Sequence, residues 1–311
     1  MLAIRPKTLS AGAMPVIVGA AFAQAFEVGE EWDGLFGDYD VAWARFAGAM
    51  VVALGIQVGT NLVNDVADHF KGADTRERLG PPRVTNLGLL SPRAVVTGAI
   101  VSFALAALAG MRLLLTIPGG WGMAAWWGLV LGLLALACGV LYTVGPVSIA
   151  YLGLGEIFVL GFFGVFATAG TTLVLTGEWW QPAIVAGVAM GLLATGILEA
   201  NNIRDIPTDA PAGKRTLAVR LGDRPARVLY MLVIAGAFVA GFLAVPWPYS
   251  WTLFLCVPFA VVPVRRVLRG DSGRDLIAVL QGNSLLEVVF GIALAVSVVS
   301  AYPSPLDGPG G

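Results

Sequence analysis

Two short segments of the chain carry Asp and Asn at helical spacing, each directly after an apolar run. In the first segment Asn61, Asp65 and Asp68 stand at i, i+4 and i+7, which places them on one face of a helix. Asn64 lies four residues before Asp68 and belongs to the same segment. The pattern predicts a set of oxygen ligands at one end of a long helix.

The second segment repeats this pattern, with Asn201, Asp205 and Asp209 at i, i+4 and i+8. Pro207 interrupts it, because proline disfavours helical geometry at the preceding residue and has no backbone N–H. We therefore expect Asp209 to lie past a kink or in the first residues of a loop.

Carboxylates that gather at a membrane edge repel one another unless a cation lies between them. Asp oxygens with Asn carbonyls beside them suit Mg²⁺, which completes its shell with water and substrate phosphates. Basic side chains that could contact the same anion follow both segments, namely Lys71, Arg83, Lys214 and Arg215. These residues together predict a metal–diphosphate site.

Either acidic segment alone could be a solvated helix end. The two first aspartates, however, are 140 residues apart, and each has an Asn four residues before it at the end of an apolar run. A weak internal duplication of four helices would explain this spacing, with the site at the interface of the repeats.

Composition makes the chain an integral membrane protein. Of its 311 residues 57% are apolar, another 40 are Gly, and only 13% are charged, which is about half the usual charged share. This excludes disorder, a nucleic-acid-binding surface and an ordinary soluble enzyme. Cys138 and Cys256 lie in apolar runs and are expected to be packing residues, and the single His69 excludes a multi-histidine metal site.

Nine apolar runs are long enough to cross a bilayer, although eight or ten spans are also compatible with the pattern. The runs cover 8–26, 42–63, 94–115, 121–142, 152–176, 181–198, 228–246, 249–264 and 284–302. They predict one transmembrane domain over residues 1–302, followed by a mobile tail over 303–311 that is rich in Pro and Gly.

The distribution of basic residues predicts the orientation. With the N-terminus inside, 17 of the 19 Lys and Arg residues fall on the inner side, and only Arg45 and Arg112 fall outside. The expected topology is N-inside and C-outside in the plasma membrane, with the inner segments 61–93 and 199–227 and their acidic residues facing the cytoplasm.

These motifs resemble the UbiA superfamily of intramembrane aromatic prenyltransferases over nearly the whole chain. The resemblance rests on Asn64-Asp65-x-x-Asp68, on Asp205-x-x-x-Asp209 followed by Gly213-Lys214-Arg215-Thr216-Leu217, on Leu141-Tyr142-Thr143-x-Gly145-Pro146 and on Gly153-x-Gly155-Glu156. Within it, Arg5-Pro6-Lys7-Thr8-Leu9 and Gly80-Pro81-x-Arg83-Val84-Thr85 are most similar to the branch that prenylates 1,4-dihydroxy-2-naphthoate in menaquinone biosynthesis. The first motif departs from the superfamily pattern, because Gly72 replaces a third Asp and Asp74 follows two residues later.

The resemblance implies an all-helical bundle of nine spans around a central cavity, with the two acidic motifs facing each other under a cytoplasmic cap. It implies a Mg²⁺-dependent transfer of a polyprenyl group from polyprenyl diphosphate, in which Asp65, Asp68, Asp205 and Asp209 hold the metal ions. Three further groups take part in this scheme. Tyr142 could stabilise an allylic cation, and Arg5 or Lys7 could bind the acceptor carboxylate.

Other readings remain open at this stage. The acceptor could be 4-hydroxybenzoate or homogentisate, and a secondary transporter of an anionic substrate could also show repeats and paired charges. Transporter sites lie near the bilayer midplane, whereas these clusters lie at the ends of spans. Glu156 and Glu287 fall within predicted spans, where ionisable groups are functional candidates by default, but the sequence assigns neither a step.

Overall fold

A computed structural model describes residues 9–29, 39–71, 85, 87–141 and 153–302. In these ranges the regular structure is entirely helical and no β-strand occurs, so the predicted all-α class is confirmed. The main helices are α1 (Ser10–Gly29), α2 (Tyr39–Lys71), α3 (Pro92–Leu115), α4 (Met123–Leu141), α5 (Gly155–Leu160), α6 (Ala167–Thr176), α7 (Gln181–Asp209), α8 (Leu217–Leu221), α9 (Asp223–Ala244), α10 (Val257–Arg269) and α11 (Leu276–Ala301). A 3₁₀ segment over Tyr249–Cys256 leads into α10.

Eight helical segments of the described chain are long and apolar enough to cross a membrane, and Ser10–Phe26 is a shorter apolar helix. Each coincides with one of the nine predicted runs, although the number of spans and their orientation stay predictions. The difference that bears on the acidic motifs lies at the ends of α2 and α7. These helices continue past the apolar runs to Lys71 and Asp209, so both acidic motifs are helical.

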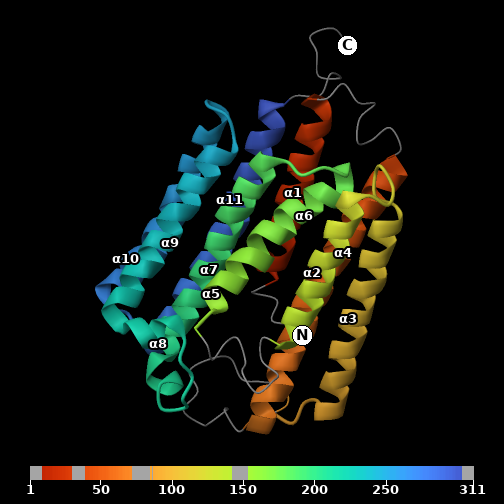
Figure 1. Cartoon of the computed structure of the whole chain (residues 1–311). Coiled ribbons are helices and arrows are strands. Elements are labelled where there is room, and N and C mark those ends of the chain that lie inside the picture. Colours follow the sequence, from red (N-terminus) through yellow and green to blue (C-terminus); the bar gives the residue numbers. More distant parts are fainter. Residues whose placement is uncertain (1–8, 30–38, 72–84, 86, 142–152, 303–311) are drawn as a thin grey trace.

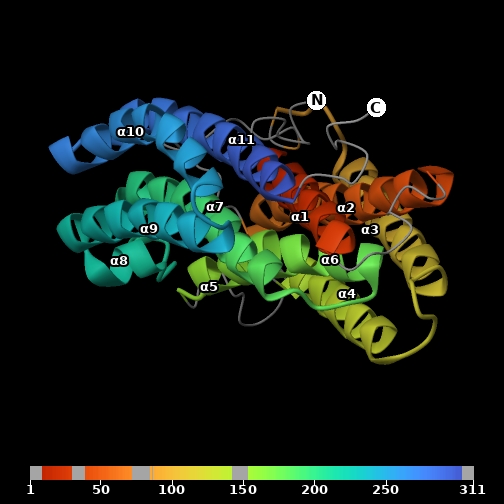
Figure 2. The ribbon, with the colours of Figure 1, turned by 90° about the horizontal axis from the view of Figure 1, so that it is seen from above.

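The helices stand roughly side by side and form one bundle (Figures 1 and 2). Seen from above, α8, α9 and α10 lie at one end, and α2, α3 and α4 lie at the other (Figure 2). The main hydrophobic core joins α1, α7, α9, α10 and α11 around the fully buried Tyr230, Phe22 and Phe290. Smaller clusters hold α2 against α3 and α1.

Close helix approaches tie the middle of the bundle together. A Cβ atom on Gly164 would overlap with the backbone of Gly187 and Gly191 on α7. On the other side, the hydroxyl of Thr172 in α6 donates to the carbonyl of Gly19 in α1 at 2.9 Å. Small residues let membrane helices approach in this way, so α6 is fixed between α1 and α7.

A π-helix over Gly161–Phe166 separates α5 from α6. The rings of Phe158 and Phe162 stack at 5.7 Å between centroids, and those of Phe162 and Phe166 meet edge to face at 5.2 Å. Because a π-helix has a wider turn than an α-helix, side chains four residues apart stay nearly in line. The three rings form one aromatic strip.

Candidate active site

The ends of α2 and α7 that carry the acidic motifs both lie at the lower end of the bundle in Figure 1. On α2, Asp65 is 3% exposed, whereas Asn61 and Asn64 are half-buried. Asp68 and Lys71 belong to the last turns of the same helix. The predicted site residues Arg5, Lys7, Asp74, Arg83 and Tyr142 lie outside the described residues.

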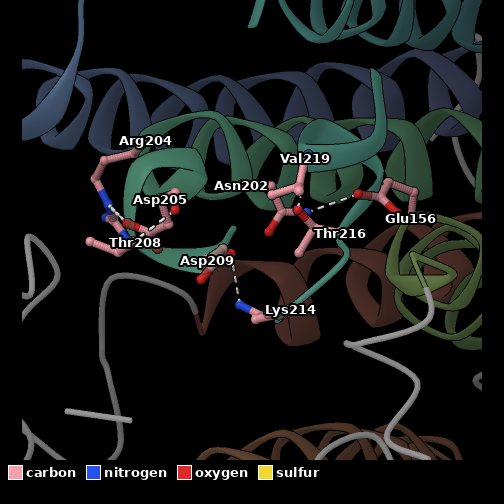
Figure 3. A network of polar contacts seen from close by, with 9 residues as sticks. All are labelled: Glu156, Asn202, Arg204, Asp205, Thr208, Asp209, Lys214, Thr216 and Val219. Carbon is pink, nitrogen blue, oxygen red and sulfur yellow. Dashed lines mark hydrogen bonds and ion pairs between the residues drawn. The ribbon is translucent and has the colours of Figure 1, made fainter. Parts of the chain in front are cut away.

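Asp205 is held by its neighbour in sequence on α7. Nε and Nη2 of Arg204 donate to the two carboxylate oxygens of Asp205 at 2.7 and 2.6 Å (Figure 3). Arg204 is 5% exposed, and a bidentate contact of this kind fixes the plane of the carboxylate. Sequence reasoning had not selected Arg204, because residues i and i+1 do not share a helix face.

The expectation that Asp209 lies in the first residues of a loop is wrong. α7 includes Pro207 and continues to Asp209. Proline in the last turn removes a single backbone hydrogen bond, and the surrounding turn is held by other donors. The hydroxyl of Thr208 donates to the carbonyl of Asp205 at 3.0 Å, and the N–H of Ala210 donates to the carbonyl of Ile206 at 3.2 Å.

The turn after α7 places the ammonium group of Lys214 beside the end of the helix. Gly213 has a φ of +73°, a conformation that favours glycine. The backbone N–H of Lys214 then donates to the carbonyl of Asp209 at 3.0 Å, and its Nζ donates to the Asp209 carboxylate at 3.1 Å. Arg215 is exposed. Thus Lys214 joins the acidic stripe, and Arg215 extends from the next position toward the surface.

A second buried network lies one turn before Asp205 and connects α7 to α5. Nδ2 of Asn202 donates to Oε1 of Glu156 at 2.8 Å (Figure 3), and the hydroxyl of Thr195 reaches the Glu156 carbonyl at 3.4 Å. Glu199 is fully buried, and its carboxyl group interacts with that of Glu156. The only sequence signal for this network was the presence of an ionisable residue in an apolar run.

The glycine that precedes Glu156 by three residues packs against the same region. Gly153 has a φ of +68°, and a Cβ atom there would lie 2.9 Å from the carbonyl oxygen of Arg215. The Gly153-x-Gly155-Glu156 motif therefore brings the start of α5 against both α7 and the turn that follows it. Glu287, by contrast, lies elsewhere: Ser10 donates to its Oε2 at 2.8 Å, which joins α1 to α11.

A cavity of about 450 Å³ lies between α2 and α7. Its wall is contributed by α1, α2, α3, α4, α7 and the stretch from α5 to α6, and it is mostly apolar. Phe158, Phe162 and Phe166 line one side. Asn61 and Asn64 of α2 and Asn201 of α7 also line it, so the structure brings the amides of the two motifs into the wall of one cavity.

The residues that could hold a metal ion have suitable chemistry. Asp205 and Asp209 each have a cationic partner, Arg204 and Lys214, which is the response expected of carboxylates that need counter-charge. Their oxygens are ligands that hard divalent cations accept. Among the described residues no three His, Cys, Asp or Glu side chains already form a ligand cluster.

The helical bundle, the membrane-spanning lengths and the paired Asn–Asp helix ends around an apolar cavity define an intramembrane protein whose site can accommodate both an anion and a hydrocarbon chain. The model of the UbiA prenyltransferase family matches residues 12–285. The chain belongs to the UbiA prenyltransferase family.

The chain is similar to known proteins over most of its length. A Mycobacterium tuberculosis protein named 1,4-dihydroxy-2-naphthoate octaprenyltransferase is 38% identical over 296 residues, covering 94% of this chain and 93% of the relative. An Escherichia coli protein of the same name is 34% identical and covers 86% and 83%. A solved UbiA homologue from Archaeoglobus fulgidus, bound to GPP and Mg²⁺, has a TM-score of 0.63 at 15% identity and covers 96% of this chain and 98% of its own. That likeness supports the fold.

Proposed function

We propose that this multi-pass membrane protein transfers a polyprenyl group from polyprenyl diphosphate to 1,4-dihydroxy-2-naphthoate, with loss of diphosphate and CO₂, in menaquinone biosynthesis. The observation that carries this proposal is the single cavity whose wall is apolar along most of its length and carries the Asn side chains of both acidic motifs. The names of the two relatives support the choice of acceptor.

The chemistry divides between the two parts of the site. The apolar wall holds the hydrocarbon chain of the donor, because a polyprenyl tail is as apolar as lipid. The diphosphate accepts charge-assisted hydrogen bonds from four basic side chains, namely Lys71, Arg83, Lys214 and Arg215. The bond between the allylic carbon and its oxygen breaks, and diphosphate departs with the electron pair. The electron-rich ring carbon then forms the new C–C bond, and loss of its carboxylate as CO₂ restores aromaticity.

Asp65, Asp68, Asp205 and Asp209 would hold divalent cations, of which Mg²⁺ is the expected one. When bound, such an ion neutralises charge on the departing diphosphate. In this scheme Arg204 orients the Asp205 carboxylate, and the aromatic face of Tyr142 stabilises the allylic cation. Arg5 or Lys7 binds the carboxylate of the acceptor.

Product mass is the direct test of this function. Purified protein is incubated with Mg²⁺, a prenyl diphosphate and one acceptor at a time from 1,4-dihydroxy-2-naphthoate, 4-hydroxybenzoate and homogentisate. We expect a prenylated and decarboxylated naphthoquinol from the first acceptor alone. Product from 4-hydroxybenzoate or homogentisate in place of the naphthoate would transfer the proposal to that acceptor, and absence of product from all three would refute it.

The proposed location is the plasma membrane, with the acidic helix ends on the cytoplasmic side. Single cysteines test the orientation in a background with Cys138→Ala and Cys256→Ala. A cysteine in place of Ser91, which caps α3 by accepting from the N–H of Ala94, should resist an impermeant thiol reagent added to intact cells. One in place of Gly37, in the predicted outer loop, should react. The reverse labelling would invert the topology.

A further inference from the structure

Gln57 extends the amide stripe of α2 deeper into the bundle. Gln57, Asn61 and Asn64 stand at i, i+4 and i+7 on α2, and all three line the cavity. Gln57 is 4% exposed. Since α-helices rise 1.5 Å per residue, Gln57 lies about 10 Å along the helix axis from Asn64 and further from the acidic helix end.

The rest of the wall offers little polar chemistry at this depth. Among the described residues that line the cavity none is charged, and apart from the amides only Thr60, Met111, Cys138 and Thr171 carry a polar or sulfur group. The Thr171 hydroxyl donates to the Ala167 carbonyl of its own helix at 2.6 Å. The amides are therefore the main groups that can hydrogen-bond to a molecule in the cavity.

α1 leaves space for the Gln57 side chain. Gly12 of α1 also lines the cavity, and a Cβ atom on Gly12 would overlap with Oε1 of Gln57. Even alanine at this position would force the amide to move. The glycine thus defines where the Gln57 amide stands in the wall.

The chemistry of the two substrates decides which of them this amide suits. A polyprenyl tail has no group that can donate a hydrogen bond to an amide or accept one from it. A ring hydroxyl can both donate and accept, and a side-chain amide offers an acceptor and two donors. We propose that Gln57 hydrogen-bonds to a ring hydroxyl of the aromatic acceptor and is a specificity-determining residue for it. This inference rests on the proposed function and deepens it.

Separate binding measurements test the inference without turnover. The dissociation constants of 1,4-dihydroxy-2-naphthoate, kept anaerobic, and of geranyl diphosphate are measured for the wild-type protein and for Gln57→Leu. We expect the naphthoate constant to rise about 10-fold and the geranyl diphosphate constant to stay within about twofold, as for loss of one hydrogen bond to an uncharged group. Thr171→Val, which changes another polar residue of the wall, is the matched control and should alter neither.

An acceptor analogue identifies the group that is contacted. The same binding measurement is made with 1-hydroxy-2-naphthoate, which lacks one ring hydroxyl. Wild-type protein should prefer the dihydroxy compound, and Gln57→Leu should lose most of that preference. Gly12→Ala, which moves the amide without removing it, should weaken naphthoate binding in the same selective way and gives a second variant if Gln57→Leu does not fold.

Three results would overturn the inference. They are an equal loss of both ligands, an unchanged preference between the two naphthoates, and unchanged naphthoate binding. Each would mean that Gln57 only packs α2 against α1. Failure of the proposed function is a different result, because wild-type protein would then yield no prenylated naphthoate in the product assay whatever Gln57 does to binding.

Discussion

The hydrogen bond between Asn202 and Glu156 should contribute to both stability and metal use. It joins two helices at a point where both partners are buried, since Asn202 is 7% and Glu156 8% exposed. Glu156→Leu removes the acceptor and leaves the Asn202 amide buried without it, and Asn202→Leu does the reverse. Glu156→Gln keeps a carbonyl oxygen at nearly the same place.

The expected magnitude follows from this geometry. Hydrogen bonds to charged groups contribute about 1.5–3 kcal/mol, and a buried group that loses its partner costs about 1–3 kcal/mol. Each Leu variant should therefore lower the free energy of unfolding by about 2–4 kcal/mol. The double variant should lose less than the sum by about 1.5–3 kcal/mol, whereas Glu156→Gln should lose about 1 kcal/mol or less.

Unfolding in mixed micelles, followed by circular dichroism across a titration with SDS, measures these energies. The measurements form a double-mutant cycle that compares the wild type, the two single Leu variants and the double variant. Strictly additive losses would refute the reasoning, because they would mean that the two side chains contribute independently of each other.

A functional readout separates positioning from simple stability. Asn202 lies three residues before Asp205 on α7, so loss of the contact should raise the Mg²⁺ concentration for half-maximal prenyl transfer. Glu287→Leu is the matched control, since it also removes a buried carboxylate with a side-chain partner, the Ser10 hydroxyl at 2.8 Å. It should destabilise the protein and leave the Mg²⁺ requirement unchanged. An equal rise for both variants would count against a positioning role for Glu156.

Three further predictions address the site and the packing around it. Asp205→Asn should reduce turnover at least about 10²-fold, as for loss of several kcal/mol of transition-state stabilisation, and full turnover of this variant in EDTA would exclude the metal scheme. Lys214→Gln should weaken use of prenyl diphosphate by about 1.5–3 kcal/mol, while Arg269→Gln, at the end of α10, should do little. Kinetics at varied prenyl diphosphate decide between them, and equal small effects would mean that these bases only orient the protein. Gly19→Val should lower the midpoint of thermal unfolding, because a Cβ atom there would overlap with the carbonyl oxygen of Thr168; an unchanged midpoint would mean that α1 and α6 can separate without cost.

Local patterns were sufficient for the fold class and for the two motif helices. Apolar length determines whether a helix can cross a bilayer, and the i, i+4 spacing of Asn61 and Asp65 is a property of a single helix. For the same reason the equivalent spacing of Asn201 and Asp205 identified the second motif. Both patterns can be recognised in the sequence because each depends only on residues that are close together in the chain.

Tertiary contacts account for what the sequence did not reveal. Glu156 and Asn202 are 46 residues apart in the sequence, and no pattern around either residue indicates that their side chains are in contact. Gln57 resembles any polar residue near a helix face until Gly12 of α1 is seen to lie directly against its amide. The error at Pro207 had a different origin, because an average propensity was applied to a last helical turn where alternative hydrogen bonds were at hand.

The π-helix between α5 and α6 sets the rotation of one half of the span relative to the other, and each half is fixed by a side-chain contact to another helix. On its near side Glu156 must point to α7, and on its far side Thr172 must point to α1. A π-helical turn takes up one residue more than an α-helical turn, so Gly161–Phe166 accommodates an extra residue while both anchors keep their direction. Deleting one residue would let this stretch become a regular α-helix with little change in phase, whereas inserting one would rotate one half against the other by about 100° and leave only one anchor in place. The span should therefore tolerate the loss of one residue here far better than the gain of one.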